Sequence, residues 1–236
     1  MVRGNAYNDF RLSKEVLKEE MMQKRQTLPA LTRDSKLIVV MRAKDASQYV
    51  KVIDTLLAEG IRSFELTQTT PGTLDMLPQL VERYGAEAEL GIGTVTTIDE
   101  VDRAARNGAA YLVTPVTNAA VIERAIAREV PIIPGGLTPT ELFESWNLGT
   151  AAVKIFPANQ VGPSYLKDLR GPFPDVLGIP SGGVDIEATR QWLAAGAPAV
   201  SVGGPLVGDA FRGGEMSQLA ERARKFVSAV SEVAGL

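Results

Sequence analysis

One pattern occurs eight times between residues 36 and 236, a short apolar run followed by a longer amphipathic segment. The apolar runs, rich in Val, Ile and Leu, span residues 37–41, 63–67, 89–95, 111–116, 131–134, 151–156, 176–180 and 199–203. The amphipathic segments span residues 47–59, 73–84, 98–107, 119–129, 139–147, 164–170, 186–195 and 215–233. Near-continuous apolar strands that alternate with helices are typical of a parallel sheet covered on both faces.

Eight consecutive units with no break in composition predict an α/β protein with a single closed (β/α)8 TIM barrel over residues 36–236. An open doubly wound sheet is the alternative that the same alternation allows. Glycines follow six of the amphipathic segments, where the left-handed conformation would end a helix. These are Gly60, Gly85, Gly108, Gly149, Gly171 and Gly196.

Residues 1–35 precede the first apolar run and form a charged N-terminal extension. Its apolar residues Leu12, Val16, Leu17 and Met21 are spaced along one helical face. The extension is therefore predicted to contain an extra N-terminal helix that packs on the outside or the bottom of the barrel. A partly frayed tail is the alternative.

The chain of 236 residues contains neither Cys nor His. This absence excludes disulfides, Ser-His-Asp and Cys-His arrangements, and zinc sites built on imidazole or thiolate. The net charge of −3 gives no basic field for nucleic acid or an anionic membrane. Because no apolar stretch resembles a signal peptide or a membrane span, a cytoplasmic protein is expected. Acid–base and nucleophilic chemistry must then come from Lys, Asp, Glu, Tyr, Ser or Thr, or from a metal held by oxygen ligands.

In a (β/α)8 barrel the site lies where the strands end. The polar residues and glycines at these ends are Arg42, Glu65, Thr94, Thr114, Lys154, Ser181, Gly182, Gly183, Gly203 and Gly204. Lys154 stands within Ala-Ala-Val-Lys-Ile-Phe-Pro, an otherwise apolar run, and alternation turns it toward the barrel interior. Burial disfavours the ammonium form, and a neutral amine can attack a ketone to form a Schiff base. A purely structural pairing of Lys154 with an interior carboxylate is the alternative.

Glu65 shares the inward face of its strand with Thr67 and Thr69. It is predicted to neutralise Lys154, to transfer protons in Schiff-base chemistry, or to do both. The glycine pairs Gly182-Gly183 and Gly203-Gly204 could direct backbone N–H groups at a phosphate, although simple tight turns also contain such pairs. Arg42 could hold a carboxylate through two hydrogen bonds, or form a salt bridge at the barrel rim.

Several motifs occur together and in a characteristic order. They are Glu65 with Thr67 and Pro71, Gly91-Ile92-Gly93-Thr94-Val95, Val113-Thr114-Pro115, Pro134-Gly135, Val153-Lys154-Ile155-Phe156-Pro157-Ala158, Gly171-Pro172-Phe173-Pro174 and Pro180-Ser181-Gly182-Gly183-Val184. Over about residues 36–230 this order resembles the KDPG/KHG aldolases, class I enzymes that act on 2-keto-3-deoxy-6-phosphogluconate (KDPG) or 4-hydroxy-2-oxoglutarate (KHG).

The resemblance implies Lys154 as the Schiff-base lysine and Glu65 as the general acid–base. It also implies that Thr94 contacts the pyruvate carboxylate, that Pro115 and Phe156 form pocket walls, and that the glycine loops (Gly182, Gly183 and Gly203) bind phosphate. Members of this family are commonly homotrimers of sugar-acid catabolism, as in the Entner–Doudoroff pathway, and need no metal or other cofactor.

The chain departs from the family pattern at three positions. Thr69 replaces an arginine of some members, so Arg42 is expected to bind the anion instead. Gly204 stands where many members carry a phosphate-binding serine, and Ser181 precedes the glycines where phosphogluconate aldolases often carry threonine.

Reversible cleavage of KDPG to pyruvate and glyceraldehyde 3-phosphate is therefore the predicted reaction, with Thr114 among the substrate-binding residues. Cleavage of KHG or another non-phosphorylated 2-keto acid is one alternative. A metal-dependent pyruvate aldolase or oxaloacetate decarboxylase, and a non-catalytic barrel that binds sugar acids, are the others.

Overall fold

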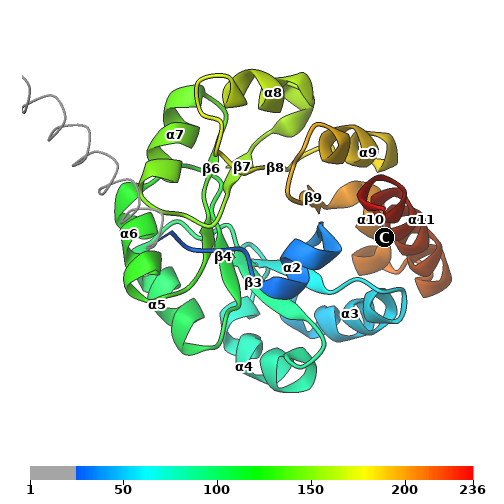
Figure 1. The fold of residues 1–236 in the computed structure, drawn as a ribbon. Helices are drawn as coiled ribbons and strands as arrows, with labels where there is room; N and C mark the ends of the chain where they lie inside the picture. The colour runs from blue at the N-terminus through cyan, green and yellow to red at the C-terminus, as the bar shows by residue number, and fades with distance from the viewer. Residues whose placement is uncertain (1–24, 236) are drawn as a thin grey trace, which may run out of the picture.

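The computed structural model describes residues 25–235. Parallel strands lie at the centre with helices arranged around them (Figure 1). The strands are β1 (Leu37–Met41), β2 (Ser63–Thr67), β3 (Glu89–Gly93), β4 (Tyr111–Val113), β5 (Ile132–Ile133), β6 (Gly135–Gly136), β7 (Val153–Ile155), β8 (Gly178–Pro180) and β9 (Val200–Val202). None of the helices in residues 25–235 combines the length and the hydropathy that a membrane span requires.

The strands form two parallel sheets, ordered β5-β4-β3-β2-β1-β9 and β6-β7-β8, rather than the expected single sheet. The predicted strand at 131–134 is split because Pro134 has no N–H to donate to a ladder. Its carbonyl still accepts a hydrogen bond from the N–H of Lys154 at 2.7 Å, so the split strand borders β7. At the other edges, a bridge between Ser181 and Ser201 links β8 to β9. The two sheets therefore meet at both of their edges.

The helices largely follow the predicted segments. They are α2 (Ala30–Ser35), α3 (Tyr49–Ala58), α4 (Thr73–Tyr84), α5 (Ile98–Arg106), α6 (Ala119–Ala127), α7 (Pro139–Asn147), α8 (Ser164–Arg170), α9 (Ile186–Ala194), α10 (Gly204–Val207) and α11 (Met216–Ala234), with 3-10 turns η1 (Ala46–Gln48), η2 (Ala158–Gln160) and η3 (Ala210–Arg212). The short helices α2 and α10 and the 3-10 turns were not predicted, because they are too short to show a periodic pattern.

The prediction that six glycines adopt the left-handed conformation holds at four of them. These are Gly60, Gly108, Gly149 and Gly196. It is wrong at Gly85 and Gly171, whose φ angles of −61° and −53° are right-handed. At Gly85 the chain keeps its helical path for one more residue, since its N–H donates to the carbonyl of Val81 at 2.8 Å.

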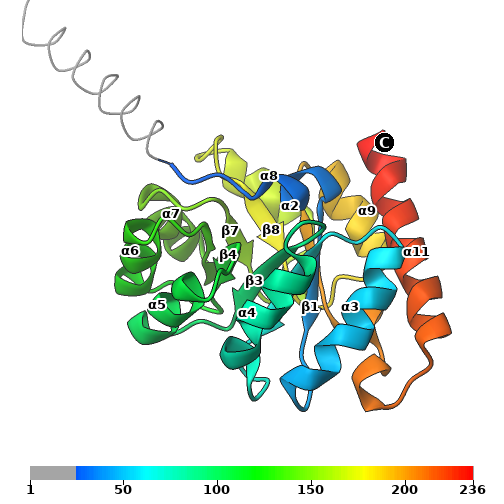
Figure 2. The ribbon, with the colours of Figure 1, turned by 90° about the horizontal axis from the view of Figure 1, so that it is seen from below.

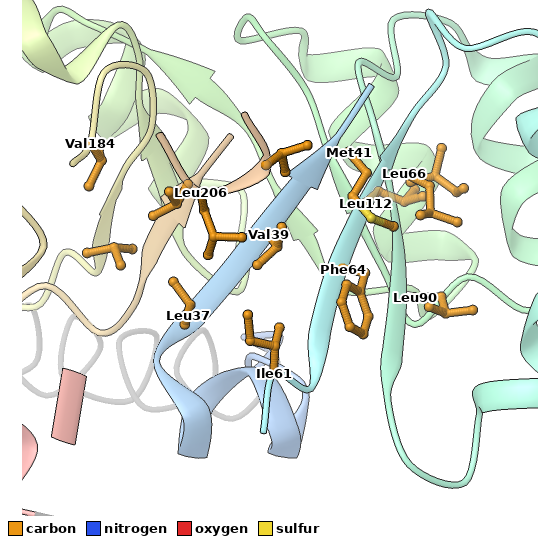
Figure 3. Packing of buried hydrophobic residues seen from close by; sticks show 14 of the residues in the cluster. Leu37, Val39, Met41, Ile61, Phe64, Leu66, Leu90, Leu112, Val184 and Leu206 are labelled. Carbon is orange, nitrogen blue, oxygen red and sulfur yellow. The ribbon is translucent and has the colours of Figure 1, made fainter. Parts of the chain in front are cut away.

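Strand alternation divides the apolar residues into two buried layers. Leu37, Val39 and Met41 of β1 belong to the larger layer, which lies between the strands and the surrounding helices (Figure 3). Ile38 and Tyr111 belong to the smaller layer, which the opposite faces of the strands enclose. The core therefore has an outer shell of apolar side chains and an inner one, as expected for parallel strands covered on both sides.

Residues 25–35 pack against the end of the molecule where the strands begin, with α2 lying across it (Figures 1 and 2). Leu28 joins the inner apolar layer and is 6% exposed. The Arg25 guanidinium lies 3.6 Å from the centre of the Trp146 ring and donates a hydrogen bond to the Trp146 carbonyl. The Gln26 side chain bonds to the carbonyl of Val130 and to the N–H of Ile132. This part of the predicted extension is thus an integral part of the core, whereas the helix expected over Leu12–Met21 lies outside the described residues.

A buried polar chain connects α2 to the strands. The carboxylate of Glu89 accepts hydrogen bonds from the N–H groups of Leu31 and Thr32. The Thr32 hydroxyl lies 2.6 Å from that of Ser63, which lies 2.9 Å from the Tyr111 hydroxyl. The side-chain oxygens of Glu89, Thr32, Ser63 and Tyr111 therefore all have partners, as buried polar groups usually do.

Leu28→Ala should lower the free energy of unfolding by about 2–4 kcal/mol, because it leaves a cavity in the inner apolar layer. Urea denaturation followed by circular dichroism measures this change. The matched control is Ile98→Ala at a position that is 45% exposed, for which a change below about 0.5 kcal/mol is expected. Equal losses for the two variants would show that Leu28 does not seal the base.

Candidate active site

A cavity of about 410 Å³ opens where the strands end, within the size range of small-molecule sites. It collects residues from distant parts of the chain. The predicted site residues that line it are Arg42, Glu65, Thr94, Pro115, Lys154, Phe156, Ser181, Gly182, Gly183, Gly203 and Gly204. Eleven of the twelve predicted positions are therefore brought to one cavity, and Thr114 is the exception.

Lys154 is the middle residue of β7, and its neighbours Val153 and Ile155 belong to the outer apolar layer. Alternation consequently turns Lys154 inward, where its side chain is 9% exposed. Its Nζ lies 3.9 Å from Oε1 of Glu65, beyond hydrogen-bond distance, and 5.0 Å from the centre of the Phe156 ring. The amine is therefore buried, close to one carboxylate and directed into the cavity.

Glu65 occupies the centre of β2 and its side chain is only 2% exposed. Its Oε2 atom is buried, and no described residue forms a hydrogen bond with it. Burying an unpaired carboxylate oxygen is energetically costly, and such groups concentrate at functional sites. The arrangement leaves one oxygen of Glu65 available to take and return a proton.

Two glycines of β3 make room for this interior. A Cβ atom on Gly93 would lie 2.1 Å from Oε1 of Glu65, and one on Gly91 would lie 2.2 Å from the Tyr111 ring. Both glycines face inward at alternate positions of β3, so only a residue without a side chain fits there. Burial raises the pKa of the Tyr111 hydroxyl well above its usual value, and the nearby charge of Glu65 raises it further.

Thr94 follows β3, which ends at Gly93 rather than at Val95 as predicted. Its φ of 62° places a β-branched residue in the left-handed region, which such residues rarely adopt. Backbone strain of this kind persists where the surroundings enforce it and is frequent at binding sites. The turn directs Thr94 to the cavity wall instead of continuing the strand.

Thr114, which the sequence predicts to bind substrate, is not among the residues that line the cavity. The strand β4 ends at Val113, and the Thr114 side chain is used by the backbone around it. Its hydroxyl donates to the carbonyl of Val116 and accepts from the N–H of Gly135 at 3.2 Å. Thr114 thus joins the ends of β4 and β6, and its neighbour Pro115 lines the cavity.

Arg42 is an exposed residue directly after β1. The Thr70 hydroxyl accepts a hydrogen bond from the N–H of the next residue, Ala43, at 2.9 Å and so fixes this turn. The salt bridge considered for Arg42 is not formed with any carboxylate among residues 25–235. Its guanidinium is therefore free to meet an anion that enters the cavity.

The glycine loops also face the cavity. Gly182 and Gly183 have φ angles of 94° and 70°, and a Cβ on Gly183 would lie 2.8 Å from that of Asn159. In the described chain, the N–H groups of Gly182, Gly183 and Gly204 donate no backbone hydrogen bond outside the regular elements. Ser181 is 4% exposed, and its hydroxyl donates to that of Ser201 at 3.3 Å.

Six lining residues were not predicted. They are Val40, Pro205, Val207, Gly208, Phe211 and Arg212. Most belong to the loop between β9 and α11, which α10 and η3 fold back over the strand ends. The sequence signal was the position of this loop after the last strand, because loops at that end of a barrel build its site. Among residues 25–235, no group of three acidic residues could hold a metal ion.

Known proteins with similar sequences and structures share this architecture. Residues 28–220 match the family model described as KDPG and KHG aldolase. The 2-dehydro-3-deoxy-6-phosphogalactonate aldolase of Escherichia coli (strain K12) is 32% identical over 83% of this chain and 95% of its own. The 2-dehydro-3-deoxy-phosphogluconate aldolase of Pseudomonas aeruginosa is 30% identical over 73% of this chain and 78% of its own.

A solved structure adds chemical detail. It is the KDPG aldolase of Legionella pneumophila with pyruvate captured at low pH as a covalent carbinolamine intermediate. That enzyme is 27% identical to this chain, with a TM-score of 0.76 over 83% of this chain and 95% of its own. The match to the family model and the identity with the curated relatives together place this chain in the KDPG and KHG aldolase family of carbon–carbon lyases.

Proposed function

We propose that the protein is a class I aldolase that reversibly cleaves KDPG to pyruvate and glyceraldehyde 3-phosphate. The observation that carries the proposal is the buried Lys154 amine, 3.9 Å from a Glu65 carboxylate with an unpaired oxygen, inside the cavity. The covalent carbinolamine that pyruvate forms in the Legionella relative supports the same chemistry here.

Lys154 supplies the nucleophile. In its unprotonated form the amine attacks the C2 ketone of the substrate, and loss of water from the carbinolamine gives an iminium ion. Glu65 then takes the proton of the C4 hydroxyl, directly or through water, as the C3–C4 bond breaks. The electrons of that bond move into the iminium ion to form an enamine, and the aldehyde leaves. Protonation of the enamine at C3 and hydrolysis of the imine release pyruvate and restore the amine.

The remaining cavity residues bind the substrate in this proposal. Thr94 and Arg42 hold the carboxylate next to the ketone, and Pro115 and Phe156 form the walls around the reacting carbons. Ser181 and the glycine loops, with Gly182, Gly183, Gly203 and Gly204, offer hydroxyl and N–H donors to the far end of the substrate.

At the level of the fold, we propose that the two sheets form one closed eight-stranded barrel over residues 36–236. The hydrogen bond from Lys154 to Pro134 and the bridge between Ser181 and Ser201 support closure at both edges. Residues 1–35 are proposed as an N-terminal extension whose last part seals the base. The expected homotrimer and cytoplasmic location stay predictions.

The identity of the aldehyde is tested with a panel of substrates. We expect cleavage of KDPG to exceed that of its C4 epimer, 2-keto-3-deoxy-6-phosphogalactonate, and of KHG, when kcat/KM is measured by coupled assay for each product. Activity should persist in the presence of a chelator, because the proposed electron sink is an iminium ion. A preference for the C4 epimer or for KHG would reassign the substrate, and loss of activity with the chelator would contradict the imine mechanism.

Lys154→Met should abolish turnover, with a loss of several orders of magnitude in kcat, because no other group can form the covalent intermediate. In the unmodified protein, pyruvate with borohydride should add the mass of a reduced pyruvyl group at Lys154, as measured by peptide mass spectrometry. Lys44→Met is the matched control, since Lys44 lies after β1 and does not line the cavity. An active protein that forms no adduct would exclude the imine.

Glu65→Gln should keep the ability to trap pyruvate but lower kcat by about 100-fold or more, since general acid–base catalysis contributes 10²–10⁴-fold. Single-turnover trapping and steady-state cleavage measure the two effects separately. Near-normal turnover would remove Glu65 from the mechanism.

Gly93→Ala provides a second variant for the same question, because its Cβ would displace the Glu65 carboxylate. It should lower kcat while Gly171→Ala, in a right-handed turn outside the cavity, leaves kcat unchanged.

A further inference from the structure

The cavity wall carries more positive charge than is required to bind the single carboxylate of a simple 2-keto acid. Two arginines, Arg42 and Arg212, line the cavity together with Lys154, against the single carboxylate of Glu65. Neither guanidinium is paired with a carboxylate in the part of the chain that the structure describes. One arginine balances the carboxylate next to the ketone, which leaves the other for a second anionic group on the substrate.

Arg212 is held in place by the loop between β9 and α11. Its guanidinium donates a hydrogen bond to the carbonyl of Gly208 at 3.1 Å. The preceding residue, Phe211, is 6% exposed and packs edge-on against Tyr49, with ring centres 6.0 Å apart. The η3 turn places Phe211 in the core and leaves Arg212 exposed on the cavity wall.

Arg222 of α11 braces the same loop from outside. Its guanidinium donates to the carbonyls of Leu206 and Val207 at 2.7 and 3.0 Å. Gly208 permits this approach, because a Cβ there would lie 2.8 Å from the Arg222 guanidinium. These contacts hold the loop between β9 and α11 in one conformation. Arg212 therefore loses less conformational entropy when it binds a ligand.

The backbone near Arg212 offers few donors to an anion. Pro205 follows Gly204 on the cavity wall and has no N–H. The N–H groups of Leu206 and Val207 already donate to the carbonyl of Gly203 at 3.1 and 2.9 Å. A phosphate at this side of the cavity therefore meets few backbone donors beyond the N–H of Gly204, and the Arg212 guanidinium can bind it through two parallel hydrogen bonds.

We propose that Arg212 determines specificity by binding the phosphate monoester at the aldehyde end of the substrate, while Arg42 binds the carboxylate at the other end. This inference rests on the proposed aldolase function and adds a residue to it. If Arg212 has this role, the enzyme prefers phosphorylated substrates to their dephosphorylated counterparts, and the preference depends on the Arg212 side chain.

The test compares KDPG with unphosphorylated 2-keto-3-deoxygluconate. Arg212→Gln should lower kcat/KM for KDPG by about 10- to 100-fold, mainly through KM, because a charge-assisted hydrogen bond is lost. The same variant should leave kcat/KM for the unphosphorylated substrate within about twofold, and Arg212→Lys should recover part of the preference. Lys44→Gln removes a positive charge from the neighbouring β1–α3 loop without touching the cavity and should change neither value.

Equal losses for both substrates, or an unchanged preference, would overturn the role of Arg212. A loss confined to KHG would also overturn it, since the distal group would then be a carboxylate. Trapping of pyruvate with borohydride in Arg212→Gln tests the aldolase function separately, because pyruvate has no distal group. If the unmodified protein forms no adduct, the role of Arg212 is still tested by equilibrium binding of glycerol 3-phosphate. Binding by Arg212→Gln that is about tenfold weaker than binding by the unmodified protein supports the inference, and equal binding refutes it.

Discussion

The approach of the Lys154 amine to the Glu65 carboxylate, inside an apolar interior, is the interaction on which the rest of this site depends. Two opposite charges this deep would ordinarily form a direct hydrogen-bonded pair, yet their closest atoms lie 3.9 Å apart and one carboxylate oxygen has no partner among the described residues. Both side chains line the cavity, so the amine and the carboxylate face the same space. A buried pair of this kind contributes little to stability, and the proposed aldolase mechanism gives it a use.

Two features of the strands maintain this arrangement. Alternation along β2 and β7 turns both charged side chains inward, and Gly93 on β3 leaves the volume that the Glu65 side chain occupies. Below the charged pair, Ser63 and Tyr111 continue into a chain of hydrogen bonds that ends at α2. The hydroxyl groups of Thr32, Ser63 and Tyr111 at the base of the core are thus paired with one another, while Oε2 of Glu65, which lines the cavity, has no partner among the described residues.

Loops after β1 and β9 place two arginines on the wall of the cavity that contains this pair. Arg42 and Arg212 come from opposite ends of the chain and meet on one cavity because β1 pairs with β9. The turn after β1 is fixed by Thr70, and the loop after β9 is fixed by Tyr49 and Arg222. Loops held in this way would limit the conformational entropy that the proposed binding of an anionic substrate costs.

The sequence by itself determined the alternation of strands and helices, the inward direction of Lys154 and Glu65, and the family, because these follow from residue type and spacing along the chain. Only the tertiary structure decided what depends on contacts between distant segments: the removal of Thr114 from the cavity by its bonds to the backbone, and the end of β3 at Gly93, before Thr94 turns to the cavity wall. The place of Arg212 was decided in the same way. Its position in the loop after the last strand is visible in the sequence, but its place on the cavity wall depends on the packing of Phe211 against Tyr49 and on the hydrogen bonds of Arg222.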